Sequence, residues 1–202
     1  MQTRTYSDLF DNIQAVFGSD FATIEATRIR SLVNSRANKA YLASNYWPRF
    51  LKVGEERTVL NNIIAYDESG LNSIDKFLMI HKTQPFYSNS AQEFVFYVTG
   101  EGAALVAGSL DPSTAFVTYK AVHDSIYGEQ STDTTTVPRE WFDYIAHGTY
   151  ADAMRMEGQT EKAAIADAEA MDMLTTELLR IDDQTPSFLQ GRISTNSNQQ
   201  SR

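Results

Sequence analysis

The sequence has no cysteine and only three histidines. Without cysteine there is no disulfide scaffold, no thiolate metal site and no cysteine nucleophile. The histidines are His81, His123 and His147, and no two of them stand at a close metal-ligand spacing such as H-E-x-x-H. We therefore expect no metal centre and no cofactor.

The motifs of common catalytic and nucleotide sites are missing as well. The chain has neither a G-x-S-x-G elbow nor a phosphate-binding G-x-x-x-x-G-K-[ST] loop. Residues 99–105 contain G-x-G, but Leu105 stands where a dinucleotide fingerprint needs a third small residue. We expect no catalytic residues and no enzyme. A small hydrolase with carboxylates brought together only by folding remains an alternative, because such pairs leave no spacing signature.

Long apolar runs are also absent. No run approaches the roughly 20 residues that cross a bilayer, and residues 1–6 lack the apolar region of a signal peptide. We expect a soluble chain, intracellular where it is made, with no membrane partner.

The balance of charge is acidic and uneven. The formal net charge of −9 argues against nucleic-acid binding as the main task, because neutralising phosphates needs clustered Lys and Arg. Residues 1–57 hold eight basic against six acidic side chains, whereas residues 160–183 hold two against seven. These charges are either solvated helix faces or complementary surfaces between neighbouring copies in an assembly.

A helical hairpin is predicted over residues 137–183. Pro138 suits a first helical position, Gly158 ends the first helix, and Thr160 can cap the second. The second helix has an apolar stripe at helical spacing, made of Ile165, Ala168, Met171, Leu174, Leu178 and Ile181. Two long helices joined by so short a turn are expected to pack antiparallel.

Small residues on this hairpin predict close helix packing or a ring interface. Gly148 costs about 1 kcal/mol relative to Ala inside a helix, which calls for a packing reason. The residues we assign to such contacts are Gly148, Ala151, Ala164 and Ala168.

The rest of the chain completes an α+β fold that we predict to be mainly a helical bundle. Residues 1–50 and 137–183 form one discontinuous helical domain, with a helix from about Asp20 to Asn45 and a boundary at Trp47-Pro48. Residues 57–122 form an inserted small antiparallel β region, and residues 123–136 a linker. The expected strands are Thr58–Tyr66, Ile74–Lys82, Glu93–Thr99, Ala103–Ala107 and Ala115–Ala121.

Two further features bear on partners. Residues 184–202 have the polar composition of an extended, flexible tail, and Phe188, Leu189 and Ile193 are candidate anchors for seating it on a partner. Aromatic side chains of the β region leave open a carbohydrate- or protein-binding module, although aromatics at strand spacing are more often core. They are Tyr66, Phe86, Tyr87, Tyr97 and Tyr119.

Taken together, the layout resembles the head–tail adaptor (connector) proteins of tailed bacteriophages. The first matching part is Asn34 to Ala40 followed by Trp47-Pro48, and the second is the pattern V-P-x-E-W…Y-A-D-x-x-R-x-x-G-Q-x-x-K-A…A…L. The second pattern is matched by Val137, Pro138, Glu140, Trp141, Tyr150, Ala151, Asp152, Arg155, Gly158, Gln159, Lys162, Ala163 and Leu174.

The resemblance implies a structural virion protein of the phage neck, assembled in the host cytoplasm. It implies a homo-oligomeric ring, usually a dodecamer, that docks beneath the portal protein, meets downstream tail or neck proteins, and lets packaged DNA pass without specific binding. The helices would form the ring body, the β region would face tail components, and Phe188, Leu189 and Ile193 would reach the portal. A head-closure or tail-interface protein is the nearest alternative.

Overall fold

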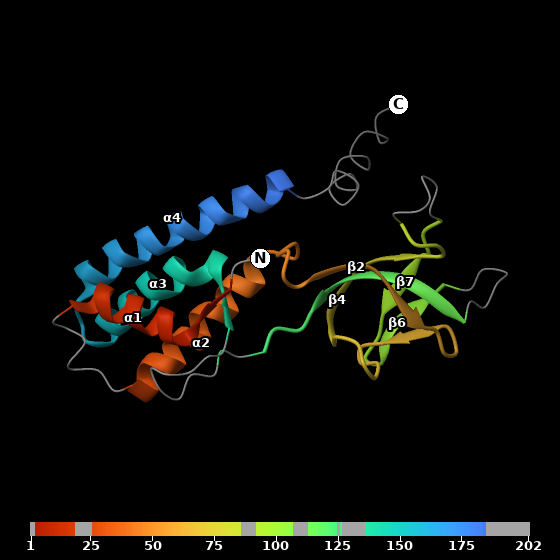
Figure 1. The fold of residues 1–202 in the computed structure, drawn as a ribbon, viewed down its shortest axis with the longest axis horizontal. Helices are drawn as coiled ribbons and strands as arrows, with labels where there is room; N and C mark the ends of the chain where they lie inside the picture. The colour runs from red at the N-terminus through yellow and green to blue at the C-terminus, as the bar shows by residue number, and fades with distance from the viewer. Residues whose placement is uncertain are drawn as a thin grey trace, which may run out of the picture. The chain divides into compact units, whose positions relative to one another are not determined.

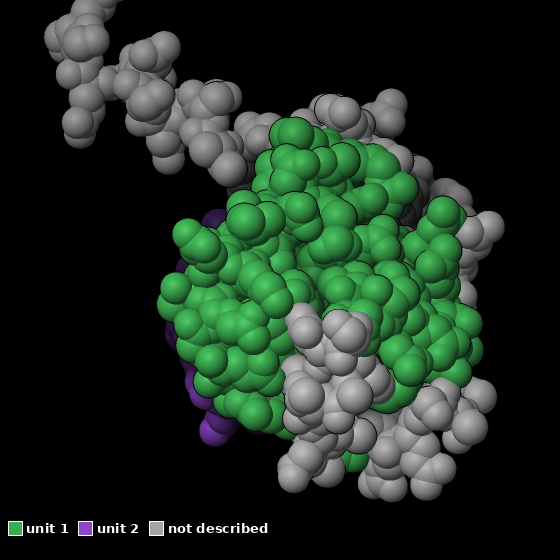
Figure 2. Space-filling view, turned by 90° about the vertical axis from the view of Figure 1, so that its left-hand side faces the viewer, with its two compact units in different colours: residues 1–46, 125–202 green, residues 47–124 purple. Residues whose placement is uncertain are grey.

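The computed structural model describes residues 3–18, 26–85, 92–106, 113–124, 126 and 136–184. The chain divides into two compact units, coloured apart in Figure 2: a helical unit of residues 1–46 and 125–202, and a β unit of residues 47–124. The sequence-based boundaries were placed at residues 50 and 57 on one side and at 122 and 137 on the other. Each unit is described by itself below.

The helical unit is assembled from both ends of the chain (Figure 1). Its described elements are β1 (Thr3–Thr5), α1 (Tyr6–Phe17), α2 (Ala26–Ala43), β8 (Thr136–Pro138), the 3₁₀-helix η2 (Arg139–Trp141), α3 (Phe142–Met156) and α4 (Thr160–Gln184). Helix α3 packs against α4 and also against α1 and α2. It is therefore the central helix of the unit, and most of its residues are buried.

A short antiparallel pair of β1 and β8 closes the helical unit. Thr3 pairs with Pro138 and Thr5 with Thr136. Pro138, expected as a helical residue, is instead the last residue of β8, and α3 begins only after η2. The reason is that Val137 and Pro138 are buried and extended against the start of the chain, a pairing between segments more than 130 residues apart that no local pattern reveals.

The β unit contains two three-stranded antiparallel sheets. The first has the order β2-β7-β4 and the second β3-β6-β5. The strands are β2 (Leu51–Thr58), β3 (Ile63–Ala65), β4 (Ile74–His81), β5 (Phe96–Val98), β6 (Gly102–Leu105) and β7 (Thr114–Ala121). One core serves both sheets, with Ile64, Ile80 and Val117 fully buried within it.

The expectation of a mainly helical bundle with a small β region is wrong. Among the described residues, eight strands in three antiparallel sheets accompany four α-helices, so the fold is a mixed α+β fold. Three strands escaped the sequence analysis, namely β1, β2 and β8, the last of which contains the Pro138 expected in a helix. β2 reads L-K-V-G-E-E-R-T, where charge and glycine hide a strand that carries a register shift between Lys52 and Glu55. β1 has only three residues, too few to show a period.

The expected strand Thr58–Tyr66 is a strand end, a turn and a second strand. Asn61 and Asn62 both have positive φ, +52° and +63°, and Leu60 and Ile63 exchange two backbone hydrogen bonds of 2.8 and 2.9 Å. Positive φ at both central residues defines the type I′ turn of a two-residue hairpin. The chain therefore reverses between Leu60 and Ile63 instead of running straight through.

Residues 185–202, which include Phe188, Leu189 and Ile193, lie outside the described residues, as does most of the expected linker 123–136. Within the described part, no helix combines the length and the apolar character that a bilayer crossing requires.

Candidate functional site

The candidate site is the surface of the helical unit formed around α3 and α4. The four hairpin residues assigned to packing or a ring interface divide into two pairs. Gly148 and Ala151 are buried on α3, and Ala164 and Ala168 lie on the exposed face of α4. The first pair serves the interior of the unit, and the second pair lies where another molecule can reach it.

The face of α4 that packs against the unit is built mainly of small residues. The buried apolar positions are Ala163, Ala166, Ala170, Leu174 and Ile181. Leu174 and Ile181 belong to the stripe expected from the sequence, but Ile165 and Met171 do not face the core, being 64% and 48% exposed. Close packing selects alanine where α3 and α4 approach, so Ile165, Met171 and Leu179 are left outside.

A buried arginine fastens α2 to this hairpin. Arg36 is 3% exposed; its Nε donates to Oδ2 of Asp152 and its Nη2 to Oδ1 of the same carboxylate, both at 2.6 Å. Nη2 also lies 2.7 Å from Oδ1 of Asp167 on α4. Arg155 completes the cluster at 2.8 Å from Asp152 and 3.2 Å from Asp167. The two-point contact with Asp152 fixes the guanidinium plane as well as its position.

Electrostatics hold this cluster charged. Burial by itself lowers the pKa of Arg36, but the hydrogen bonds to Asp152, Asp167 and Tyr144 outweigh it and leave that pKa raised. Burial likewise raises the pKa of Asp167, but Arg36 and Arg155 outweigh it and hold the pKa below its ordinary value of 3.8. Arg36 and Asp167 therefore stabilise each other's ionised forms.

Gly148 makes the arginine cluster sterically possible. A Cβ at this position would lie 2.7 Å from Cδ and 2.9 Å from Nε of Arg36. The Arg36 side chain is held at both ends of its guanidinium and has little freedom to move aside. The mid-helix glycine is thus explained by the close approach of an α2 side chain to α3.

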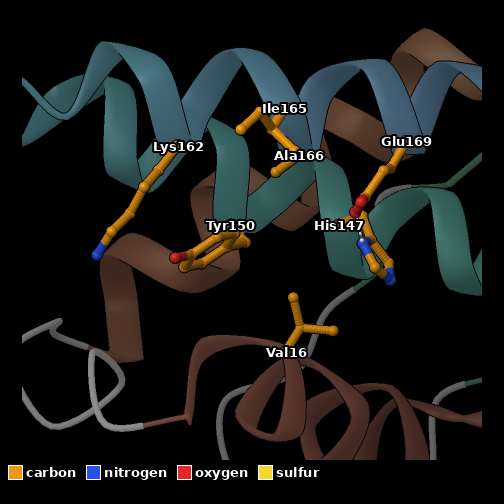
Figure 3. A pocket seen from close by; sticks show the side chains of 7 residues that line it. All are labelled: Val16, His147, Tyr150, Lys162, Ile165, Ala166 and Glu169. Atoms are coloured by element: carbon orange, nitrogen blue, oxygen red, sulfur yellow. Dashed lines mark ion pairs between the residues drawn. The ribbon is translucent and has the colours of Figure 1, made fainter.

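A pocket of about 340 Å³ lies among α1, α3 and α4 (Figure 3). Nδ1 of His147 is 3.3 Å from Oε2 of Glu169 across it. The lining consists of Val16 from α1, His147 and Tyr150 from α3, and Lys162, Ile165, Ala166 and Glu169 from α4. Its volume is at the lower end of the roughly 300–1,000 Å³ of ligand pockets and suits one large side chain of a partner.

The outward face of α4 is apolar for a surface helix. Ile165, Met171 and Leu179 are 64%, 48% and 61% exposed, and they share that face with Ala164 and Ala168. Helix α4 carries Lys162 and Arg180 against seven carboxylates along its length. Glu161 and Asp172 are also exposed at the helical spacing of Ile165 and Leu179, so this face mixes large apolar side chains with carboxylates.

The outward face of α2 has the opposite charge. Helix α2 contains Arg28, Arg30, Arg36 and Lys39 and no acidic residue. Ser31, Ser35, Asn38 and Lys39 are exposed, and Leu42 is 65% exposed beside them. Small side chains, one exposed leucine and the exposed Lys39 characterise this surface.

The β unit holds a buried charged cluster of its own. Nη2 of Arg57, a residue 1% exposed, donates to Oε2 of Glu55 at 2.8 Å and to the carbonyl oxygen of Asn72 at 2.5 Å. The Tyr119 hydroxyl donates to Glu55, and burial followed by that contact raises the pKa of Tyr119 to about 12. The cluster joins β2 to β7 and to the segment before β4.

Exposed apolar side chains of the β unit lie along β5. This strand forms one edge of the β3-β6-β5 sheet, and Val95, Tyr97 and Val98 along it are exposed. Tyr97 was named in the sequence analysis as a residue of a binding module, whereas Tyr119 is a core residue and Tyr66 is half-buried against that core. Phe86 and Tyr87 lie outside the described residues.

In the described part of the chain, no three acidic or histidine side chains gather in a way that would hold a metal ion. Sequence reasoning missed Arg36 and Asp167 as a pair, because a contact between residues 131 positions apart has no local signal. Glycine in mid-helix at position 148 was the available hint, since it marks a close approach.

Comparison of the chain with models of known protein families and with curated protein sequences finds no match. The family question therefore depends on the residues themselves.

Proposed function

We propose that this protein is a head–tail adaptor of tailed bacteriophages, a structural virion protein of the neck. In this role it forms a ring beneath the portal, joins the portal to tail components, and surrounds the channel through which DNA passes. The proposal assigns it no catalysis.

The proposal rests on the structural role of the residues of the matched pattern. Asp152 and Arg155 of that pattern build the ion cluster that holds α2, α3 and α4 together. Trp141, Ala163 and Leu174 are buried in the same hairpin. The pattern thus describes the determinants of one particular helical unit, which is what a shared architecture would preserve.

Two surface features fit the proposed partners. Strand β5 is at one edge of its sheet and has exposed Tyr97 and Val98, a surface suited to a strand or apolar patch of a tail protein. The formal net charge of −9 of the chain suits a wall past which DNA moves, because negative charge repels phosphate.

The test is to mix the purified chain with purified portal rings and measure the mass of the product, together with images of virion necks made with and without the protein. We expect a complex with several copies per portal and a missing density layer in virions that lack the chain. A chain that leaves portal mass unchanged, with neck density unaltered by its removal, would refute the proposal.

A further inference from the structure

Two unlike surfaces lie on the helical unit. Helix α3 is central: α4 packs on one side of it and α1 and α2 pack elsewhere on its surface (Figure 1). The outward faces of α4 and α2 therefore point away from the shared core in different directions. Each is available to another molecule at the same time as the other.

In the part of the chain that the structure describes, the outward face of α4 is left largely exposed by its own unit. Ile165 and Leu179 are exposed by 64% and 61% while alanines fill the inner face of the same helix. Burial of apolar surface contributes about 25 cal/mol per Å² of favourable free energy. Covering this face with another molecule is therefore favourable. Folding of the single chain does not require these larger side chains to be apolar.

Charge selects what covers it. Carboxylates lie among the apolar side chains of the α4 face, where Glu161 and Asp172 are exposed. Helix α2 has no carboxylate and presents exposed Lys39 beside Ser31 and Ser35. Two α4 faces would repel each other, whereas α4 and α2 attract.

We propose that the outward face of α4 in one copy docks on the outward face of α2 in a second copy of this chain. Ser31 and Ser35 give room for Ile165 and Met171 of the neighbour, and exposed Leu42 adds an apolar contact. Because the two faces differ, one copy keeps its α2 face free after pairing and the other keeps its α4 face free. Such heterologous contacts continue from copy to copy and close into a ring when the rotation permits.

The pairing deepens the proposed function, and ring closure around a channel rests on that function. The contact between α2 and α4, by contrast, is inferred only from the properties of the two helix surfaces. Helix α2, with 18 residues, is about 27 Å long, and one helix pair covers less than the about 800 Å² per partner of a standard interface. A single contact is therefore weak, and we expect assembly to depend steeply on concentration.

Absence of native cysteine allows a direct test. Chains with Ser35→Cys and chains with Ala168→Cys are mixed over a concentration series and oxidised gently. Both residues lie near the middle of their helices, so cross-linking does not depend on whether the helices run parallel or antiparallel. We expect Ser35–Ala168 dimers to form at least several-fold faster than dimers of either variant alone.

The matched control replaces Ala168→Cys by Glu157→Cys, an exposed position in the α3–α4 turn, and should give no excess over random collision. Lys39→Glu should slow cross-linking, and Asp172→Lys in the partner chain should restore it. Far-ultraviolet circular dichroism of every variant verifies that the helices are intact.

Each outcome decides the proposal. Predominant Ala168–Ala168 dimers, or a mixed rate no higher than the Glu157→Cys control, would overturn it. If the cysteine pair reacts but the chain does not bind portal rings, the docking stands and the adaptor function fails. If portal rings capture the chain without Ser35–Ala168 cross-links on the ring, the adaptor function stands and the docking fails.

Discussion

Both units bury one arginine among carboxylates, but the two arginines do different work. Arg36 joins three helices and reaches residues 116 and 131 positions away in the chain. Arg57 lies on a strand and contacts Glu55 two residues away, together with Asn72 and Tyr119 of the same unit. The helical unit consists of two segments far apart in the sequence, so it needs a contact that joins them. The β unit is one continuous segment and is already held together by its strand pairing.

The two tryptophans let each unit be followed separately. Trp141 is buried in the helical unit and Trp47 in the β unit, and the chain has only these two. Variants with Trp47→Phe or Trp141→Phe leave one fluorescent reporter, so the effect of any further change can be assigned to one unit.

The largest effect is expected from Arg36→Met. The methionine keeps an apolar stem but leaves Asp152 and Asp167 as carboxylates without their buried partner, and breaking such a pair costs about 3–5 kcal/mol. Urea denaturation followed by Trp141 should show this loss, while the transition followed by Trp47 should stay in place. Arg155→Met, at a half-exposed position in the same cluster, is the control and should cost about 1 kcal/mol or less. Equal losses of unfolding free energy in the two variants would mean that the burial of Arg36 does not determine its contribution to stability.

Arg57→Met should lower the free energy of unfolding by less than Arg36→Met. The loss should be seen in the fluorescence of Trp47. Arg57 donates to a carboxylate, a backbone carbonyl and a phenol, and leaving such buried groups unsatisfied costs about 1–3 kcal/mol. Denaturation followed by Trp47 measures it. A shift of the Trp141 transition by the same amount would contradict the division of labour between the two arginines.

Gly148→Ala should cost about 1–3 kcal/mol, as overpacking of a filled site does, because its Cβ would lie 2.7 Å from Cδ of Arg36. In an Arg36→Ala background that contact is gone, and the same change should become neutral or stabilising by up to about 1 kcal/mol, the helix preference of alanine over glycine. The double-mutant cycle from urea denaturation gives the coupling energy. Additive effects would show that Gly148 serves something other than Arg36.

The mildest difference is expected in the response to pH, with opposite signs in the two units. The pKa of Asp167 is below its ordinary 3.8 in the folded state, so its stabilising contribution is full above that value and is lost as the pH falls through the folded pKa. The pKa of Tyr119 is raised from 10.0 to about 12, so its contribution is full below pH 10.0 and is lost as the pH rises to about 12.

Trp141 should therefore report acid weakening of the helical unit, and Trp47 should report alkaline weakening of the β unit. Asp167→Asn and Tyr119→Phe are the matched variants, each expected to flatten only its own limb of the stability–pH curve. An unchanged acid slope in Asp167→Asn would assign that slope to other carboxylates.

Periodicity predicted the elements of this fold that are long and continuous. The hairpin, its Gly158 turn and the strands β4 and β7 lie close to their expected ranges, because each has enough residues to show a period. The choice of buried face on α4 could not be predicted in the same way. A search for large apolar residues selects Ile165 and Met171, whereas packing against α3 needs Ala163, Ala166 and Ala170.

The missed features share a physical cause, which is dependence on distant partners. β1 is a strand only because β8 is beside it, and β2 tolerates its charges because Arg57 finds Tyr119 across the sheet. One local signal was present and unused: consecutive Asn61 and Asn62 are residues that tolerate positive φ, which a type I′ hairpin turn requires. That signal would have separated β2 from β3.

The pairing at the base of the β unit has a consequence for how such a chain changes over time. Leu51 pairs with Lys120, and the amide of Ala121 donates to the carbonyl of Phe50 at 2.8 Å, so the unit begins and ends at one antiparallel rung. Opposite residues on such a rung are only about 5 Å apart. Because the two ends of the β unit lie side by side, this unit can be lengthened, replaced or shortened to a loop. The helical unit keeps its own stabilising ion pairs through Arg36.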